Sequence, residues 1–185
     1  MLISIMSKNY FTKYLDKLSK TLINYNEESF LKIVKIIKEI KKNNKIILVG
    51  NGGSAAMASH VSVDLTKMCK IRAINFNEAD LLTCFSNDFG YENWVREALS
   101  SYADKGDLVI CISSSGESKN IIHGAKFAKK MGCKVITLTG FDVNNKVKKI
   151  GHVNLWVDSK NYNVIEMIHH TWLLSIVDFI AKAKY

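Results

Sequence analysis

The chain has 185 residues, a length that suits a single domain with a full hydrophobic core. Hydrophobic residues make up 48% of it and charged residues 23%, which is the composition of a soluble globular protein and excludes a disordered or fibrous chain. The formal net charge is +9, but the lysines are spread over most of the predicted helices, so we do not expect nucleic acid as a partner.

Features that would direct the chain to a membrane or out of the cell are not found in the sequence. There is no signal-peptide pattern, and the longest apolar run, around residues 172–177, is too short to cross a bilayer. The four cysteines are scattered without a C-x-x-C pair, and Cys111 and Cys133 fall in predicted buried strands. This usage is typical of a reducing compartment. We therefore expect a cytoplasmic protein with no membrane partner.

Two amphipathic helices are predicted at the start of the chain, over residues 8–25 and 27–42. Asn26 is the expected N-cap of the second helix. We expect these helices to form a helical hairpin over residues 1–44, ahead of an α/β core over residues 45–185.

Strands and helices alternate through the rest of the chain, so residues 1–185 are interpreted as one domain. The strand segments are apolar throughout, as expected of parallel strands that are covered on both faces. This pattern predicts a doubly wound, five-stranded parallel sheet that binds its ligand at the carboxyl ends of the strands. Strands are predicted at 45–50, 72–76, 107–112, 133–138 and 153–157, and helices at 54–68, 78–86, 91–103, 117–131, 143–149 and 163–183.

The helices offer more apolar surface than one small sheet can cover. The last helix, over residues 163–183, is apolar around much of its circumference, and both N-terminal helices are strongly amphipathic. Packing on the sheet is the simple alternative for this surface. Its extent instead predicts a helical interface in a homo-oligomer.

Two loops rich in glycine and serine follow predicted strands and precede predicted helices. They are Gly-Asn-Gly-Gly-Ser at residues 50–54 and Ser-Ser-Ser-Gly-Glu-Ser at residues 113–118. Backbone N–H groups at a helix N-terminus favour an anion, and the hydroxyls add further donors. The alternative for the serines is a simple turn. Two such loops in one domain indicate a ligand with a phosphate at one end and hydroxyls along the rest, which describes a sugar phosphate.

The set of motifs resembles the SIS (sugar isomerase) domain, and most closely its phosphoheptose isomerase branch. The resemblance rests on the two loops above, the second of which is followed by Asn120, on His60, on Asn-Asp-Phe-Gly at residues 87–90 and on Leu-Thr-Gly at residues 138–140. It covers essentially the whole chain. It implies a flavodoxin-like fold and an oligomer, which we expect to be a tetramer. It also implies which residues bind the phosphosugar: Asn51, Gly52, Gly53, Ser54, Asp88, Ser113, Ser114, Ser115 and Ser118.

Within that set the resemblance implies three roles. The serines of residues 113–118 hold the phosphate, with Ser54 facing them, and Asn51 contacts sugar hydroxyls. Asp88 approaches a substrate, either in its own subunit or in a neighbouring one.

The reaction centre departs from the family pattern. The family has a His and, four residues later, a Glu on the helix after the first loop, and the resemblance places His60 and Asp64 there. It has a Gln and, eight residues later, a His on the last helix, where this chain has Glu166 and Leu174. The glutamate is thus shortened, and the second histidine is replaced by leucine.

A histidine at another position offers a replacement. His170 lies four residues after Glu166, so His60/Asp64 and Glu166/His170 each share one helix face. Two histidines and two carboxylates suit a divalent metal such as zinc, and they equally suit acid–base chemistry on an enediol. We interpret the site as shifted, with Asp64, Glu166 and His170 as the catalytic residues.

The resemblance implies an aldose–ketose isomerase that converts sedoheptulose 7-phosphate to a manno-heptose 7-phosphate for lipopolysaccharide or capsule synthesis. One alternative is a non-catalytic SIS protein that senses a phosphosugar or acts as a scaffold, like the SIS protein that associates with the bacterial replication initiator. Another is an isomerase of a five- or six-carbon phosphosugar.

Overall fold

The computed structural model describes the backbone of residues 2–183 and the side chains of residues 9–183. Residues 1, 184 and 185 of the expected single domain lie outside the described residues.

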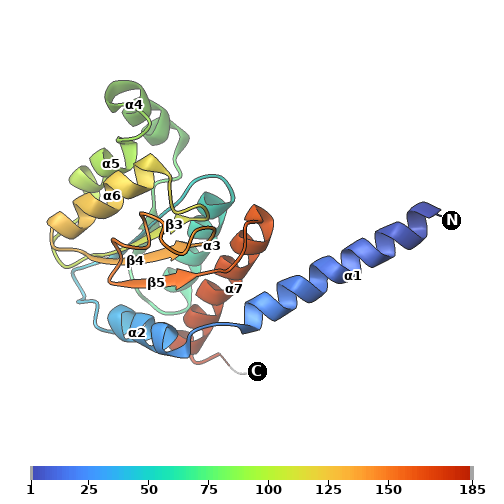
Figure 1. The fold of residues 1–185 in the computed structure, drawn as a ribbon. Helices are drawn as coiled ribbons and strands as arrows, with labels where there is room; N and C mark the ends of the chain where they lie inside the picture. Colours follow the sequence, from blue (N-terminus) through green and yellow to red (C-terminus); the bar gives the residue numbers. More distant parts are fainter. Residues whose placement is uncertain (1, 184–185) are drawn as a thin grey trace.

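A five-stranded, all-parallel sheet forms the centre of the molecule, as predicted (Figure 1). Its strand order is β2-β1-β3-β4-β5, so the chain runs outward from β1 to β2 and then returns past β1 to β3. The carboxyl ends of β1 and β3 therefore flank the point at which the topology changes direction, which is where open α/β sheets bind ligands. The strands are β1 (Ile46–Val49), β2 (Ala73–Asn75), β3 (Leu108–Ser113), β4 (Lys134–Thr139) and β5 (Val153–Trp156).

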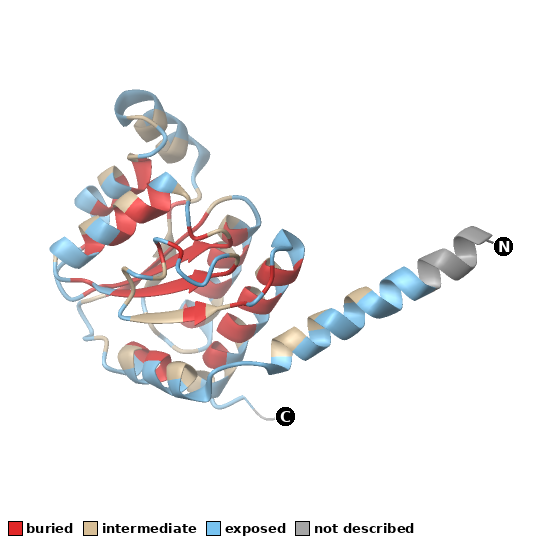
Figure 2. Cartoon of the chain, viewed as in Figure 1, coloured by how far each residue is buried: buried red, intermediate tan, exposed pale blue. Residues whose placement is uncertain are grey.

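Helices cover both faces of the sheet and divide the core into two layers (Figure 2). Alternate strand residues point to opposite layers, so Ile46 packs beneath α2, α3 and α7 while Ile47 packs beneath α5 and α6. This double cover explains why the strands are apolar without alternation. The helices are α1 (Leu2–Ile23), α2 (Glu27–Lys38), α3 (Gly53–Lys67), α4 (Ala79–Phe89), α5 (Trp94–Tyr102), α6 (Lys119–Lys130) and α7 (Tyr162–Ala181).

The two N-terminal helices diverge after the turn at residues 24–26, and α1 projects away from the body of the molecule (Figure 1). The expected hairpin is therefore not the arrangement seen in the single chain. Asn26 caps α2 as predicted, with Oδ1 accepting a hydrogen bond from Ser29 N at 2.7 Å. The second half of α1 is attached to the core: Tyr14, Leu18 and Leu22 pack against it, and Trp172 Nε1 donates to the Leu22 carbonyl at 3.0 Å.

The prediction of a helix over residues 143–149 is wrong, because this segment forms a series of turns. The side chain of buried Asn145 donates to the carbonyls of Gly140 and Asp142, and Val147 N donates to the Gly116 carbonyl at 3.0 Å. The polar groups of the segment therefore hydrogen-bond to each other and to the loop at residues 113–118. The side chain of Asn145 competes with the backbone hydrogen bonds that a helix would need.

Helix α7 is long and apolar enough to cross a membrane by length and composition alone. In the structure it packs as a core helix beside α3, with buried side chains from Val164 to Val177. Its apolar character is thereby accounted for in part by the core of the α/β domain.

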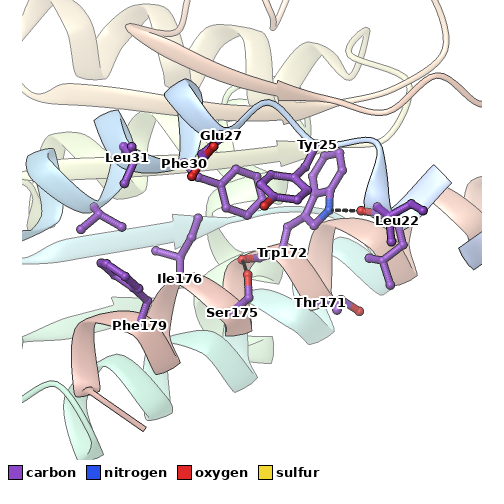
Figure 3. Close-up of a pocket in the computed structure, with 12 residues that line it drawn as sticks. Leu22, Tyr25, Glu27, Phe30, Leu31, Thr171, Trp172, Ser175, Ile176 and Phe179 are labelled. Atoms are coloured by element: carbon purple, nitrogen blue, oxygen red, sulfur yellow. Dashed lines mark hydrogen bonds between the residues drawn. The ribbon is translucent and has the colours of Figure 1, made fainter. Parts of the chain in front are cut away.

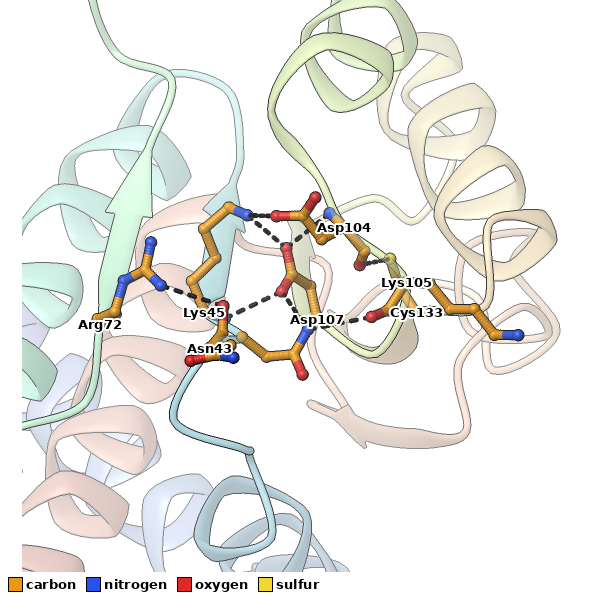
Figure 4. A network of polar contacts seen from close by, with 8 residues as sticks. Asn43, Lys45, Arg72, Asp104, Lys105, Asp107 and Cys133 are labelled. Atoms are coloured by element: carbon orange, nitrogen blue, oxygen red, sulfur yellow. Dashed lines mark hydrogen bonds and ion pairs between the residues drawn. The ribbon is translucent and has the colours of Figure 1, made fainter.

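A buried ion pair closes the opposite, amino edge of the sheet (Figure 4). Asp107 is fully buried and accepts bonds from Lys45 Nζ at 2.8 Å and Asn44 Nδ2 at 2.9 Å. Burial alone would raise the pKa of Asp107, but these bonds and one from the backbone N–H of Asp104 hold it below its ordinary value. The network fixes the loop before β3 far from the carboxyl edge.

Candidate functional site

The first loop lies between β1 and α3 at the carboxyl edge of the sheet. Gly52 has φ of +54°, a left-handed conformation that favours glycine, and α3 begins at the next residue. Ser54 is buried, and its N–H donates to the Asn51 carbonyl at 3.0 Å. A Cβ at Gly53 would overlap the carboxylate of Glu166, so glycine here lets α7 place that carboxylate against the start of α3.

The second loop, residues 113–118, lies between β3 and α6. Ser113 Oγ donates to Ser118 Oγ at 3.2 Å, and Ser115 Oγ accepts from Glu117 N at 3.2 Å. The hydroxyl of Ser114 is buried and has no partner among the described residues. An unpaired buried hydroxyl is costly, so its place in a loop of hydroxyls at a helix N-terminus favours a polar ligand there.

The segment that follows β4 closes over the second loop. Gly116 has φ of +69°, and a Cβ there would overlap the side chain of Asn145. Glu117 receives the backbone N–H of Lys146 at 3.0 Å and pairs with its ammonium at 2.7 Å. These contacts fix the loop before any ligand arrives, which reduces the entropy that binding would cost.

A pair of asparagine amides joins the two loops. Asn51 Nδ2 donates to Asn120 Oδ1 at 3.0 Å, and Asn120 Nδ2 donates to Asn51 Oδ1 at 2.8 Å. Tyr91 OH donates to the same Asn51 oxygen at 3.3 Å. Sequence reasoning included Asn120 among the motif residues but assigned neither Asn120 nor Tyr91 to the site. The available signal was position: Asn120 lies two residues after Ser118 on the first turn of α6, and Tyr91 follows the motif at residues 87–90.

Helices α3 and α7 bring two histidines into contact. His170 Nε2 lies 3.0 Å from His60 Nδ1, with the rings nearly perpendicular, and His60 Nε2 lies 3.3 Å from Asp64 Oδ2. Glu166 lies one helical turn before His170, about 6 Å along the axis of α7. The structure therefore places all four predicted reaction-centre residues along one α3–α7 interface.

The contact between the two histidines constrains which ring nitrogens carry a proton. The carboxylate of Asp64, 3.3 Å from His60 Nε2, favours a proton on that nitrogen, and His60 Nδ1 then accepts a hydrogen bond from His170 Nε2–H. His170 Nδ1 is then left as a proton acceptor. Partial burial lowers the pKa of His170, and the neighbouring His60 lowers it further, so His170 is neutral near pH 7.

The two carboxylates occupy different surroundings. Partial burial raises the pKa of Glu166, which lies against Gly53. Asp64 is half-buried and faces His60. A carboxylate with a raised pKa beside a neutral histidine is a suitable arrangement for moving a proton between two carbon atoms.

The predicted zinc site is not formed by this arrangement. Within residues 2–183 no group of three or more His, Cys, Asp and Glu side chains has a geometry that could hold a metal ion. The nitrogens of His60 and His170 that would be ligands face each other in a hydrogen bond. We therefore derive no step through a metal.

Three other residues lie outside the contact between His60 and His170. Leu174 packs against the α2–α3–α7 layer of the core. Asp88 is exposed at the end of α4, where its carboxylate accepts from Asn87 Nδ2 at 2.9 Å and lies 3.7 Å from the thiol of Cys84. His169 is fully buried, and its Nε2 lies 3.1 Å from the Thr139 carbonyl. Burial lowers the pKa of His169 to about 4, which marks a neutral packing residue.

Comparison with known proteins adds a family and several relatives. A family model described as "SIS domain" matches residues 9–140. A phosphoheptose isomerase of Aliarcobacter butzleri is 39% identical over 155 residues, covering 80% of this chain and 82% of that protein. A probable phosphoheptose isomerase of Thermoplasma acidophilum is 36% identical, covering 86% and 91%. The solved structure of a phosphoheptose isomerase from Neisseria gonorrhoeae superposes with a TM-score of 0.83 at 25% identity, covering 99% of this chain and all of that one.

Proposed function

The chain belongs to the SIS domain family, and from this we propose that it is a phosphosugar aldose–ketose isomerase of the phosphoheptose type. Its substrate is sedoheptulose 7-phosphate and its product a manno-heptose 7-phosphate, for lipopolysaccharide or capsule heptose in the cytoplasm. Relatives that carry the name phosphoheptose isomerase match most of the chain.

The main support for catalytic activity is the contact between His170 and His60. It supplies a second histidine to the reaction centre although the family position holds Leu174. A binding protein would not require a neutral histidine and a carboxylate of raised pKa side by side.

The phosphate is the anchor of the substrate. It binds at residues 113–118, where hydroxyls and the N-terminus of α6 converge, with Ser54 contributing from the first loop. Asn51 in the first loop binds the sugar. Fixing the far end of the chain orients the carbonyl carbon and its hydroxyl-bearing neighbour against α7.

The reaction moves one hydrogen between adjacent carbons. Glu166, as carboxylate, takes the proton from the hydroxyl-bearing carbon next to the carbonyl, which gives an enediolate, and returns it to the former carbonyl carbon. His170 transfers the second proton between the two oxygens, through Nδ1. Asp64 and His60 hold His170 in the tautomer that this transfer requires.

A homotetramer is the proposed assembly. A groove of about 410 Å³ runs between the end of α1, α2 and α7, lined by Tyr25, Phe30 and Trp172 among others (Figure 3). On the projecting part of α1, Tyr10 and Phe11 are 63% and 60% exposed. An apolar groove and an apolar free helix on one chain are complementary surfaces for further copies of it, and burying them supports an oligomer. Asp88, exposed on α4, then serves the site of a neighbouring copy.

Turnover of sedoheptulose 7-phosphate by the purified protein, followed by the appearance of the aldose, tests the function. Measurement with and without a chelator separates metal-free from metal-dependent catalysis. Tight binding of the phosphosugar without turnover would instead support the second candidate, a non-catalytic SIS protein, which the core packing of Leu174 favours.

A further inference from the structure

The amide pair between Asn51 and Asn120 fixes one side chain with another. The two hydrogen bonds run in opposite directions between the same two planar groups, at 3.0 and 2.8 Å, so they set both the distance and the rotation of the amides. Asn120 is only 2% exposed, whereas Asn51 is half-buried at the mouth of the first loop. Asn120 therefore lies behind Asn51 and not at the surface that a substrate meets.

Counting donors and acceptors on Asn51 shows what remains for a ligand. The carbonyl oxygen of an amide has two lone pairs, and here they accept from Asn120 Nδ2 and Tyr91 OH. The amide nitrogen has two hydrogens, and one of them goes to Asn120 Oδ1. The other has no bond to any residue that the structure describes. Asn51 thus presents a hydrogen-bond donor and no free acceptor.

The position of that donor connects it to the reaction centre. Gly53, two residues after Asn51, contacts the carboxylate of Glu166. Asn120 lies on the first turn of α6, two residues after Ser118 of the phosphate loop. The pair therefore bridges the loop that binds phosphate and the loop that touches the proposed base.

We propose that Asn120 is a positioning residue, which holds Asn51 as a hydrogen-bond donor to an oxygen at the reacting end of the sugar. This inference rests on the proposed isomerase function. A donor that is fixed in advance stabilises negative charge on an enediolate oxygen without reorganisation. Asn51 therefore requires a ligand oxygen that accepts a hydrogen bond, as a carbonyl or enediolate oxygen does.

A double-mutant cycle tests the proposal. In Asn120→Ala, Asn51 loses its fixed orientation, and kcat for sedoheptulose 7-phosphate should fall about tenfold or more. The same substitution in an Asn51→Ala background should cause little further loss, because Asn120 acts through Asn51. The affinity for inorganic phosphate, measured by calorimetry, should change less than about twofold, since the phosphate loop is intact.

Asn44→Ala is the matched control. It removes an amide with two hydrogen bonds at the opposite edge of the sheet, so it should leave kcat unchanged whatever it does to the melting temperature. Equal losses from Asn120→Ala in both backgrounds, or a parallel loss of phosphate affinity, would show a general structural role and overturn the proposal.

The double-mutant cycle can also be measured by ligand binding, without enzymatic turnover. If the wild-type protein binds the phosphosugar but does not convert it, the proposed function fails, and the same four proteins are compared by their dissociation constants for sedoheptulose 7-phosphate. Non-additive losses for the sugar, with phosphate affinity unchanged, would still support Asn120 as the residue that positions Asn51. Additive losses would refute it.

Discussion

His170 Nε2 and His60 Nδ1 lie 3.0 Å apart, on two helices whose histidines are 110 residues apart in sequence. A neutral imidazole has one donor and one acceptor, so this contact commits one nitrogen of each ring and leaves only one outer nitrogen on each. The carboxylate of Asp64 lies 3.3 Å from the outer nitrogen of His60. The outer nitrogen of His170 is the one that is left for chemistry.

Replacing His170 should therefore impair the reaction more than binding. We expect His170→Leu to lower kcat about 10²-fold or more, the usual scale for loss of an acid–base group, with a small change in KM. Steady-state kinetics with sedoheptulose 7-phosphate provides the measurement. Met167→Leu, an exposed position on the same helix, is the control and should retain full activity. Full activity in His170→Leu would assign the second proton transfer to another group.

The pH profile should report the surroundings of Glu166. Burial raises its pKa above the ordinary value of 4.5, and only the ionised form acts as base, so kcat/KM should rise with pH through that raised value and then level off. Because the pKa of His170 is lowered, no second limb is expected near 6.5. The profile of Glu166→Gln should be low and flat. A wild-type limb at 4.5 or below would contradict the assignment.

Ser114 should separate ligand binding from stability. Its buried hydroxyl has no partner among the described residues, so Ser114→Ala removes an unsatisfied group and should leave the free energy of unfolding unchanged or raise it. If the hydroxyl binds phosphate, affinity for the phosphosugar should fall by about 1–3 kcal/mol. Calorimetry and urea unfolding give the two quantities. Ser100→Ala, on the exposed face of α5, should alter neither. Lower stability with unchanged affinity would show that Ser114 is a structural residue.

The oligomer should depend on the free part of α1. Replacing Phe11 and Leu15 by Lys places charges on two side chains that are each 60% exposed in the single chain, so the fold of one chain should persist. In an assembly held by this helix, the change should reduce the mass seen by light scattering to that of a smaller species. Val143→Lys, in the loop after β4, should keep the wild-type mass. A wild-type monomer at micromolar concentration would refute the tetramer.

Much of the fold could be predicted because it follows from patterns that are local in sequence. Continuous apolar strands and amphipathic helices fix the layers, and the five strands lie within one residue of their predicted limits. Residues 143–149 could not be predicted in this way. Their apolar spacing resembles a helix, but the buried side chain of Asn145 and the close approach of Gly116 give their backbone other partners. Such partners depend on contacts made after the strands have assembled.

In the candidate site, too, the features that follow from local sequence could be predicted, and those that depend on tertiary contacts could not. The loop at residues 113–118 could be placed from its position between a strand and a helix. The spacing of His60 and Asp64 likewise indicated a shared helix face, and so did that of Glu166 and His170. Spacing along one helix could not show that two imidazoles meet nitrogen to nitrogen, since that depends on how α3 and α7 cross. The metal hypothesis and the acid–base hypothesis used the same four residues, and in the structure two of their imidazole nitrogens contact each other.

The missing side chain at Gly53 has a consequence for how this site can evolve. Because a methyl group there would overlap the end of the Glu166 side chain, alanine at position 53 would require that carboxylate to turn away from the start of α3. A lineage that gains alanine at 53 must shorten or redirect its partner on α7 or lose the arrangement. The two positions should therefore covary among relatives, and a Gly53→Ala enzyme should recover activity through second-site changes at residue 166 more often than at residues remote from it.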